Sequence, residues 1–136
     1  MDIKELNQFC SHSLIGHLQI EFIHYEEGYV SAKMPVNEKT KQPMGLLHGG
    51  ASLALAETLA SVGSYLMVDI EKYNVLGMHV SGDHLATIEN GYIYGEAKLR
   101  RAGKTIHVWD VEIKDEQQNL VSISRVTNII KEKEAK

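Results

Sequence analysis

The stretch GGASLALAETLASVGSYL at residues 49–66 shapes the architecture more than any other part of the sequence. Only one of its side chains, Glu57, is charged, and most of the others are small or apolar. This composition predicts a helix that is apolar around most of its circumference, which is typical of a buried helix. A buried carboxylate is costly unless it is paired or used in chemistry. We therefore expect Glu57 to be buried as a candidate catalytic acid. The alternatives are an exposed polar face, for which the apolar neighbours leave little room, and a structural ion pair.

The segment before this helix, QPMGLLHGG at residues 42–50, has no Ser, Thr, Asp or Asn at the usual capping position. The first N–H groups of the helix then lack hydrogen-bond partners. Because they lie at the positive end of the helix dipole, they are good donors to a carbonyl oxygen on which negative charge develops. Gly49 is the candidate donor; the alternative is a plain tight turn. Glu57 follows about two helical turns later, and Ser61 lies one turn further. The acid, the hydroxyl and the helix N-terminus are therefore expected to line one groove.

Three further polar features are candidates for binding. Gln42 orients a carbonyl group or a water molecule, or it is a plain loop glutamine. His48 donates to the substrate, or it fixes the loop by bonding a backbone carbonyl. The basic turn RRAGK at residues 100–104 is either a solvated hairpin or a clamp for the phosphates of a nucleotide-bearing acyl carrier, with Arg101 and Lys104 as the binding residues.

Alternating apolar and polar residues predict strands on both sides of the long helix. The expected elements are a short helix at 3–10, strands at 17–25, 29–36, 74–85, 92–101, 106–114 and 120–130, and the long helix at 49–66. With two strands, one helix and four strands in that order, only a strongly curved antiparallel sheet wrapped around the helix buries it. This is the hotdog architecture, of the α+β class, and we expect residues 1–136 to form one such domain.

Composition argues against several other classes of protein. The formal net charge of −4 gives no basic patch for nucleic acid. The single cysteine, Cys10, cannot form an internal disulfide and fits a reducing compartment. Residues 46–68 raise the question of a membrane span, but Glu57 near their centre would cost about 2.5–3.5 kcal/mol there. The acidic start of the chain lacks the basic region of a secretory signal. We therefore expect no membrane association and a cytoplasmic location.

No metal or cofactor is expected either. His79 and His84 stand five residues apart in one predicted strand and so point to opposite faces, and the remaining histidines show no ligand spacing. The chain has neither a P-loop nor the G-x-G-x-x-G pattern that binds nucleotide phosphates, and it lacks the G-x-S-x-G of serine esterases.

The string TKQPMGLLHGGAS at residues 40–52, followed by LAE at 55–57, closely resembles the hotdog acyl-CoA thioesterases of the 4-hydroxybenzoyl-CoA type found in Arthrobacter. The most similar branch is that of the 1,4-dihydroxy-2-naphthoyl-CoA thioesterases and the enterobactin-pathway proofreading thioesterases. The resemblance covers nearly the whole chain, including SGDH at 81–84 and VWDVEI at 108–113. It implies hydrolysis of acyl-CoA or aroyl-CoA thioesters, or of acyl-carrier-protein thioesters, without metal or cofactor. It also implies a tetramer of back-to-back dimers, with each site shared across a dimer interface.

The same resemblance implies roles for individual residues. Glu57 would be the catalytic carboxylate, as nucleophile or as general base, and the Gly49 N–H would bond the thioester oxygen. Gln42 and His48 would contact the thioester. Ser61 would help to place the attacking water, and His84 would lie near the acyl pocket. The chain departs from the family pattern before that last histidine, where Asp83 replaces the usual Asn.

Two other functions stay open at this point. A hotdog hydratase or dehydratase also uses a histidine and an acid, but its histidine lies well before a glycine-proline-rich helix entry, whereas His48 abuts the glycines. A non-catalytic hotdog module that binds acyl-CoA needs no buried acid and normally carries a DNA-binding appendage.

Overall fold

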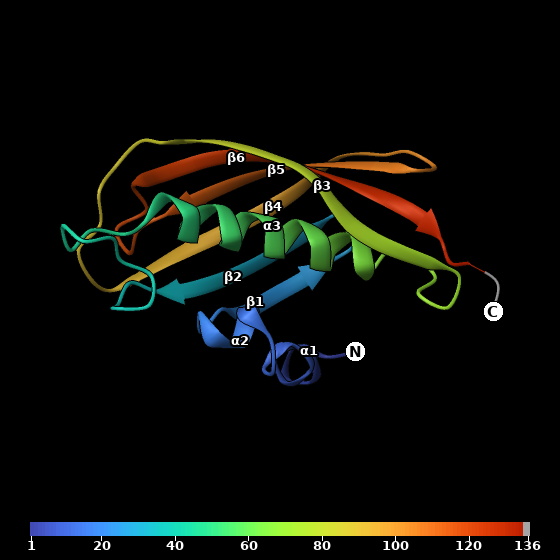
Figure 1. Cartoon of the computed structure of the whole chain (residues 1–136), viewed down its shortest axis with the longest axis horizontal. Helices are drawn as coiled ribbons and strands as arrows, with labels where there is room; N and C mark the ends of the chain where they lie inside the picture. The colour runs from blue at the N-terminus through green and yellow to red at the C-terminus, as the bar shows by residue number, and fades with distance from the viewer. Residues whose placement is uncertain (135–136) are drawn as a thin grey trace.

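The computed structural model describes residues 1–134 and shows, within them, a six-stranded antiparallel sheet that curves around a long helix (Figure 1). The helices are α1 (Ile3–Cys10), α2 (Leu14–His17) and α3 (Gly49–Tyr65). The strands are β1 (Glu21–Glu26), β2 (Tyr29–Pro35), β3 (Tyr73–His84), β4 (Tyr92–Ala102), β5 (Ile106–Lys114) and β6 (Leu120–Glu132). Their order across the sheet is β1-β2-β4-β5-β6-β3, so β1 and β3 are the edges. This is the predicted hotdog architecture.

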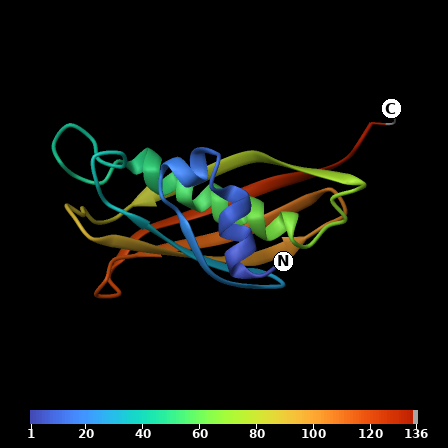
Figure 2. The ribbon, with the colours of Figure 1, turned by 90° about the horizontal axis from the view of Figure 1, so that it is seen from below.

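The long helix α3 lies along one face of the sheet, with α1 and α2 beside it near β1 (Figures 1 and 2). It has 17 residues and begins at the predicted position. Among the helices of residues 1–134, none is both long enough and apolar enough to cross a membrane.

The first predicted strand, at residues 17–25, is partly wrong. Its first residues belong to α2 and to an irregular turn, and β1 begins only at Glu21. The side chain of Ser13 caps α2 by accepting a hydrogen bond from the N–H of Ile15 (3.2 Å). Gln19 then has a φ of 60°, which interrupts any extended run. The apolar residues that suggested a strand here are nevertheless buried, so their spacing reflects burial rather than strand geometry.

The side of α3 that faces the sheet forms the centre of the core. Its fully buried apolar residues are Leu55, Ala56, Leu59 and Ala60. Two glycines allow close packing around it. A Cβ atom on Gly63 would collide with the ring of Trp109, and one on Gly95 would lie 2.6 Å from Cδ1 of Leu59. Helix and sheet therefore approach closely because side chains are missing at the points of contact.

A buried polar cluster holds the C-terminal half of α3 against β5 and β6. The Ser64 hydroxyl oxygen accepts hydrogen bonds from Nε1 of Trp109 (2.9 Å) and from Nδ2 of Asn128 (3.0 Å). Its own hydrogen is then available for Nδ1 of His107, 2.9 Å away. Burial lowers the pKa of His107, which favours the neutral ring that can accept this bond. The cluster therefore fixes the position of α3 through directional bonds as well as through packing.

Candidate active site

The N-terminus of α3 is capped by a side chain, contrary to the expectation from sequence. Nδ1 of His48 accepts a hydrogen bond from the N–H of Gly50 (2.7 Å). Ser, Thr, Asp and Asn are the usual capping residues, but a neutral imidazole nitrogen is also a hydrogen-bond acceptor and can cap a helix in the same way. The N–H of Ala51 bonds the carbonyl of His48 (3.0 Å). Within residues 1–134 no group accepts a hydrogen bond from the N–H of Gly49, which therefore stays available at the positive end of the helix.

Gly49 lines a groove of about 340 Å³, which we call the amide groove and which Gln42 and His84 also line. A Cβ atom on Gly49 would lie 2.6 Å from Nε2 of His84, so the imidazole rests directly against the glycine. The side-chain carbonyl of Gln42 accepts a bond from the N–H of Met44. Its side-chain N–H donors have no protein partner within residues 1–134. The amide groove is thus lined by two uncommitted donor groups, the Gly49 N–H and the Gln42 side-chain NH2, and by an imidazole.

Glu57 lies in a different groove of about 350 Å³, the carboxylate groove, which Ser61 and Gly50 also line. In the single chain Glu57 is exposed, so the expectation of a buried acid is wrong here. The sheet covers α3 incompletely, and Glu57 lies at its margin, beside edge strand β3. The carboxylate rests over the backbone of β3, because a Cβ atom on Gly77 would be 3.3 Å from its Oε1. A glycine inside a strand is typical of such a close approach, and this was a signal in the sequence that we did not use.

One chain does not bring the predicted residues into one groove. Gly49 and Glu57 are separated by about 12 Å along the helix axis and by about 80° around it. Gly49 consequently lines the amide groove, so the expectation of a single groove is wrong for Gly49. It is right for the acid and the hydroxyl, because Glu57 and Ser61 share the carboxylate groove with Gly50 from the first turn of the helix. Arg101 and Lys104 are exposed and lie at the β4–β5 turn, at the end of the molecule where α3 ends and away from both grooves (Figure 1).

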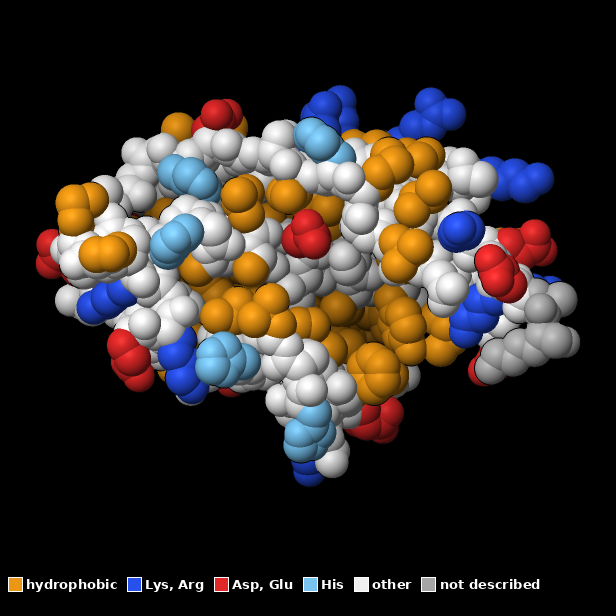
Figure 3. All heavy atoms as spheres, in the orientation of Figure 1, with side chains coloured by type: hydrophobic (Ala, Val, Ile, Leu, Met, Phe, Trp, Pro, Cys, Tyr) orange, Lys and Arg blue, Asp and Glu red, His pale blue; other side chains and the backbone are white. Residues whose placement is uncertain are grey.

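The face of the molecule that carries the carboxylate groove is unusually apolar. Hydrophobic side chains gather around α3 and β3, while Lys, Arg and most acidic groups lie toward the periphery (Figure 3). The exposed hydrophobic residues from α2, β3 and the adjoining loops include Leu14, Ile70, Leu76, Met78 and Leu85. The backbone of edge strand β3 is paired on one side only, with β6. A free strand edge beside an apolar surface is typical of a site that another molecule covers.

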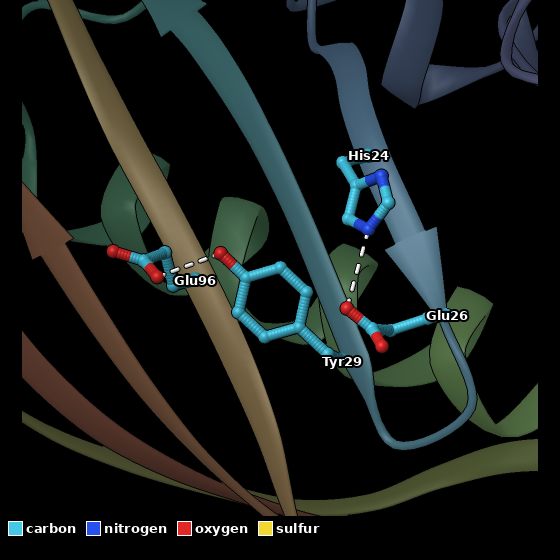
Figure 4. Close-up of polar contacts among 4 residues, drawn as sticks. All are labelled: His24, Glu26, Tyr29 and Glu96. Atoms are coloured by element: carbon cyan, nitrogen blue, oxygen red, sulfur yellow. Dashed lines mark hydrogen bonds and ion pairs between the residues drawn. The ribbon is translucent and has the colours of Figure 1, made fainter.

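Other ionisable groups with shifted pKa values lie away from the grooves. Burial, and next the hydrogen bond from its hydroxyl to Glu96 (2.7 Å), raise the pKa of Tyr29 to about 12. This pair and the contact between His24 and Glu26 (3.3 Å) lie on the face of the sheet away from α3 (Figure 4). Burial also raises the pKa of the Cys10 thiol, which disfavours the thiolate that a nucleophile needs. Within residues 1–134 no three metal-binding side chains cluster together.

Comparison with known proteins identifies the family. Residues 44–122, more than half of the chain, match the model of the thioesterase superfamily. The chain belongs to the thioesterase superfamily. This thioesterase is 38% identical over 128 residues to a 1,4-dihydroxy-2-naphthoyl-CoA hydrolase of Escherichia coli, covering 94% of this chain and 93% of that protein. It is 36% identical to a proofreading thioesterase of Klebsiella pneumoniae, covering 86% and 85% of the two chains.

Solved structures agree with this assignment. A mutant thioesterase of Pseudomonas aeruginosa superimposes with a TM-score of 0.94 at 35% identity, and the alignment covers 98% of this thioesterase and 96% of that chain. The predicted fold, the predicted branch of the family and the prediction of a thioester hydrolase are therefore confirmed. The roles of individual residues stay predictions.

Proposed function

We propose that this thioesterase hydrolyses acyl-CoA or aroyl-CoA thioesters to a free acid and a thiol, with acyl-carrier-protein thioesters as the alternative substrates. The observation that carries the proposal is the uncommitted N–H of Gly49 at the start of α3. A backbone N–H on a helix N-terminus stabilises the negative charge that develops on a carbonyl oxygen during acyl transfer. The relatives named for hydrolysis of a CoA thioester and for thioester proofreading support the same chemistry.

Two routes for Glu57 are consistent with this chemistry. In the first, its carboxylate attacks the thioester carbon, the C–S bond breaks as the thiolate leaves, and water then hydrolyses the mixed anhydride that remains. In the second, Glu57 takes a proton from water as the water oxygen attacks the same carbon, and the C–S bond then breaks to release the thiolate, which takes up a proton to give the free thiol. In both routes Gly49 polarises the carbonyl oxygen, Gln42 and His48 position the thioester, and Ser61 places the water.

The active site in this proposal is shared by two copies of the chain. Within one chain the amide groove and the carboxylate groove are separate. Antiparallel pairing of two β3 edges would extend the sheet and place the two α3 helices side by side, covering the apolar face. The carboxylate groove of one copy would then face the amide groove of the other. Two such dimers would form the tetramer.

Mixing two inactive variants tests the shared site. We expect Glu57→Gln and Gln42→Ala each to lose most of the turnover as homo-oligomers, because every site then contains one defect. When equal amounts of the two variants are mixed and refolded after reversible denaturation, about half of the dimers contain one chain of each variant. Each such mixed dimer has both defects in one active site, and its second active site is intact. Recovery of about a quarter of wild-type turnover is then expected. No recovery from a mixture that has exchanged subunits, as measured by mass spectrometry, would place both residues in the site of one chain.

A screen for released thiol tests the activity itself. Aromatic, short-chain and long-chain acyl-CoAs and an acyl-carrier-protein thioester are incubated with the protein, and a thiol-reactive dye reports the free thiol. We expect turnover with at least one class and its loss in Glu57→Gln. Hydration of an enoyl-CoA without thiol release would instead indicate a hydratase. Tight binding of acyl-CoA without turnover would indicate a binding module.

The proposed phosphate contacts of Arg101 and Lys104 need a separate control. Replacing both residues by Gln should raise KM for an acyl-CoA. The KM for the matching acyl-pantetheine thioester should stay the same, since that substrate lacks the nucleotide phosphates. An equal change with both substrates would remove these two residues from the proposed site.

A further inference from the structure

A second cavity adjoins the carboxylate groove. This cavity, which we call the inner chamber, has a volume of about 170 Å³ and lies between α1 and α3. Ile15, Ser61 and Val62 line both cavities, so the two meet at these side chains. The other residues of the inner chamber are Leu6, Phe9 and Cys10 from α1, together with Tyr65 and Val75.

The lining of the inner chamber is apolar. None of its residues carries a charge, and the sole polar groups are two hydroxyls and a buried thiol. Phe9 stacks on Tyr65 with ring centroids 5.9 Å apart and an interplanar angle of 24°, which forms an aromatic wall between α1 and the end of α3. Along α3 the chamber extends from the level of Ser61 to Tyr65, about 12 Å beyond Glu57 at its far end. An elongated apolar group whose reactive end lies at Glu57 would therefore end in this chamber.

We infer that the inner chamber binds the distal end of the substrate's acyl group and that α1 of the same chain limits the length of that group. This inference rests on the proposed function, because it takes Glu57 as the position of the reacting carbonyl. Apolar pockets select substrates by the number of methylene groups that they bury. Cys10 and Phe9 line the chamber from α1, so their sizes set the depth of the pocket.

Two variants with opposite effects test the inference. Cys10→Leu fills the chamber and should lower the ratio of kcat/KM for decanoyl-CoA to that for butyryl-CoA. Each buried methylene changes binding about fourfold, so displacing about two of them lowers the ratio about fifteenfold. Phe9→Ala removes a largely exposed wall and should shift the preference to longer chains. Gln8→Leu is the matched control, because it adds the same side chain to α1 at an exposed position and should leave the ratio unchanged.

Binding of S-decyl-CoA and S-butyl-CoA, thioethers that cannot be hydrolysed, separates the inference from the proposed function. Calorimetry should show that Cys10→Leu weakens binding of the decyl compound about fifteenfold more than that of the butyl compound. Turnover with unchanged chain-length ratios in Cys10→Leu and Phe9→Ala would overturn the inference and leave the proposed function intact. Length-dependent binding without any turnover would overturn the proposed function and support the chamber. If Cys10→Leu fails to fold, Phe9→Ala decides, since its side chain lies mostly outside the core.

Discussion

The two sides of α3 differ in how completely the rest of the chain buries their side chains and bonds their polar groups. The side that faces the sheet is closed, with its apolar residues fully buried and with Ser64 bonded to three side chains. The opposite side is open, with an exposed carboxylate at Glu57 and grooves on its surface. The closed side explains why the chain adopts this fold. The open side contains the groups that the fold does not need, and such groups are the best candidates for function.

The largest expected effect is on the open side, in Glu57→Gln. The variant removes the proposed nucleophile or base, so turnover should fall by about 10²–10⁴. Stability should change by less than about 0.5 kcal/mol, since the side chain is exposed and has no ion pair within residues 1–134. Thiol release and thermal denaturation measure the two quantities. Near-normal turnover would remove Glu57 from the mechanism.

On the closed side the opposite pattern is expected, and Gly63→Ala should show it most strongly. The new Cβ would collide with the ring of Trp109, and such overpacking costs about 1–3 kcal/mol. This exceeds the gain of about 1 kcal/mol that alanine normally brings to a helix. The melting temperature should therefore fall. Thr58→Ala, on the open side of the same helix, is the control and should change stability by less than about 0.5 kcal/mol. A melting temperature at or above that of the wild type would show that helix and sheet can separate at no cost.

Two serines one turn apart sharpen the same contrast. Ser64→Ala removes the buried acceptor of the Trp109 N–H and one of the two acceptors of the Asn128 amide, which should cost about 1–2 kcal/mol in the free energy of unfolding. Ser61→Ala, at the edge of the carboxylate groove, should be nearly neutral for stability and should lower turnover instead. Chemical denaturation of both variants measures the difference. Equal losses of stability would mean that the two sides of α3 are equally important for folding.

The smallest expected effect is a dependence of stability on pH. Burial lowers the pKa of His107 below its ordinary value of 6.5 in the folded protein. The unfolded chain therefore binds a proton at a higher pH than the folded chain does, and stability falls as the pH drops below about 6.5. One proton limits this slope to about 1.4 kcal/mol per pH unit. Unfolding of His107→Gln should depend less on pH than unfolding of the wild type, whereas the exposed His24→Gln variant should behave like the wild type. An unchanged pH profile in His107→Gln would assign the effect to another group.

Much of this structure was predictable from local patterns. The apolar stretch at residues 49–66 predicted α3, and alternation predicted every strand except the start of β1. At β1, Ser13 and Gln19 favour a short helix and a turn, and spacing of apolar residues cannot distinguish these from a strand. The string around His48 and Glu57 was sufficient to identify the family. These features were accessible because they depend on residues that are neighbours along the chain.

The sequence by itself determined the long helix, the order of the helix and strands along the chain, the family and the kind of chemistry. The tertiary structure alone decided which side of α3 is covered, and it thereby exposed Glu57 and placed it in a different groove from Gly49. Helical spacing gives the relative positions of two residues, but burial depends on how far the sheet reaches around the helix. The cap formed by His48, the close approach of Glu57 to Gly77 and the chamber beneath α1 are likewise contacts between segments, so their geometry exists only once those segments pack together.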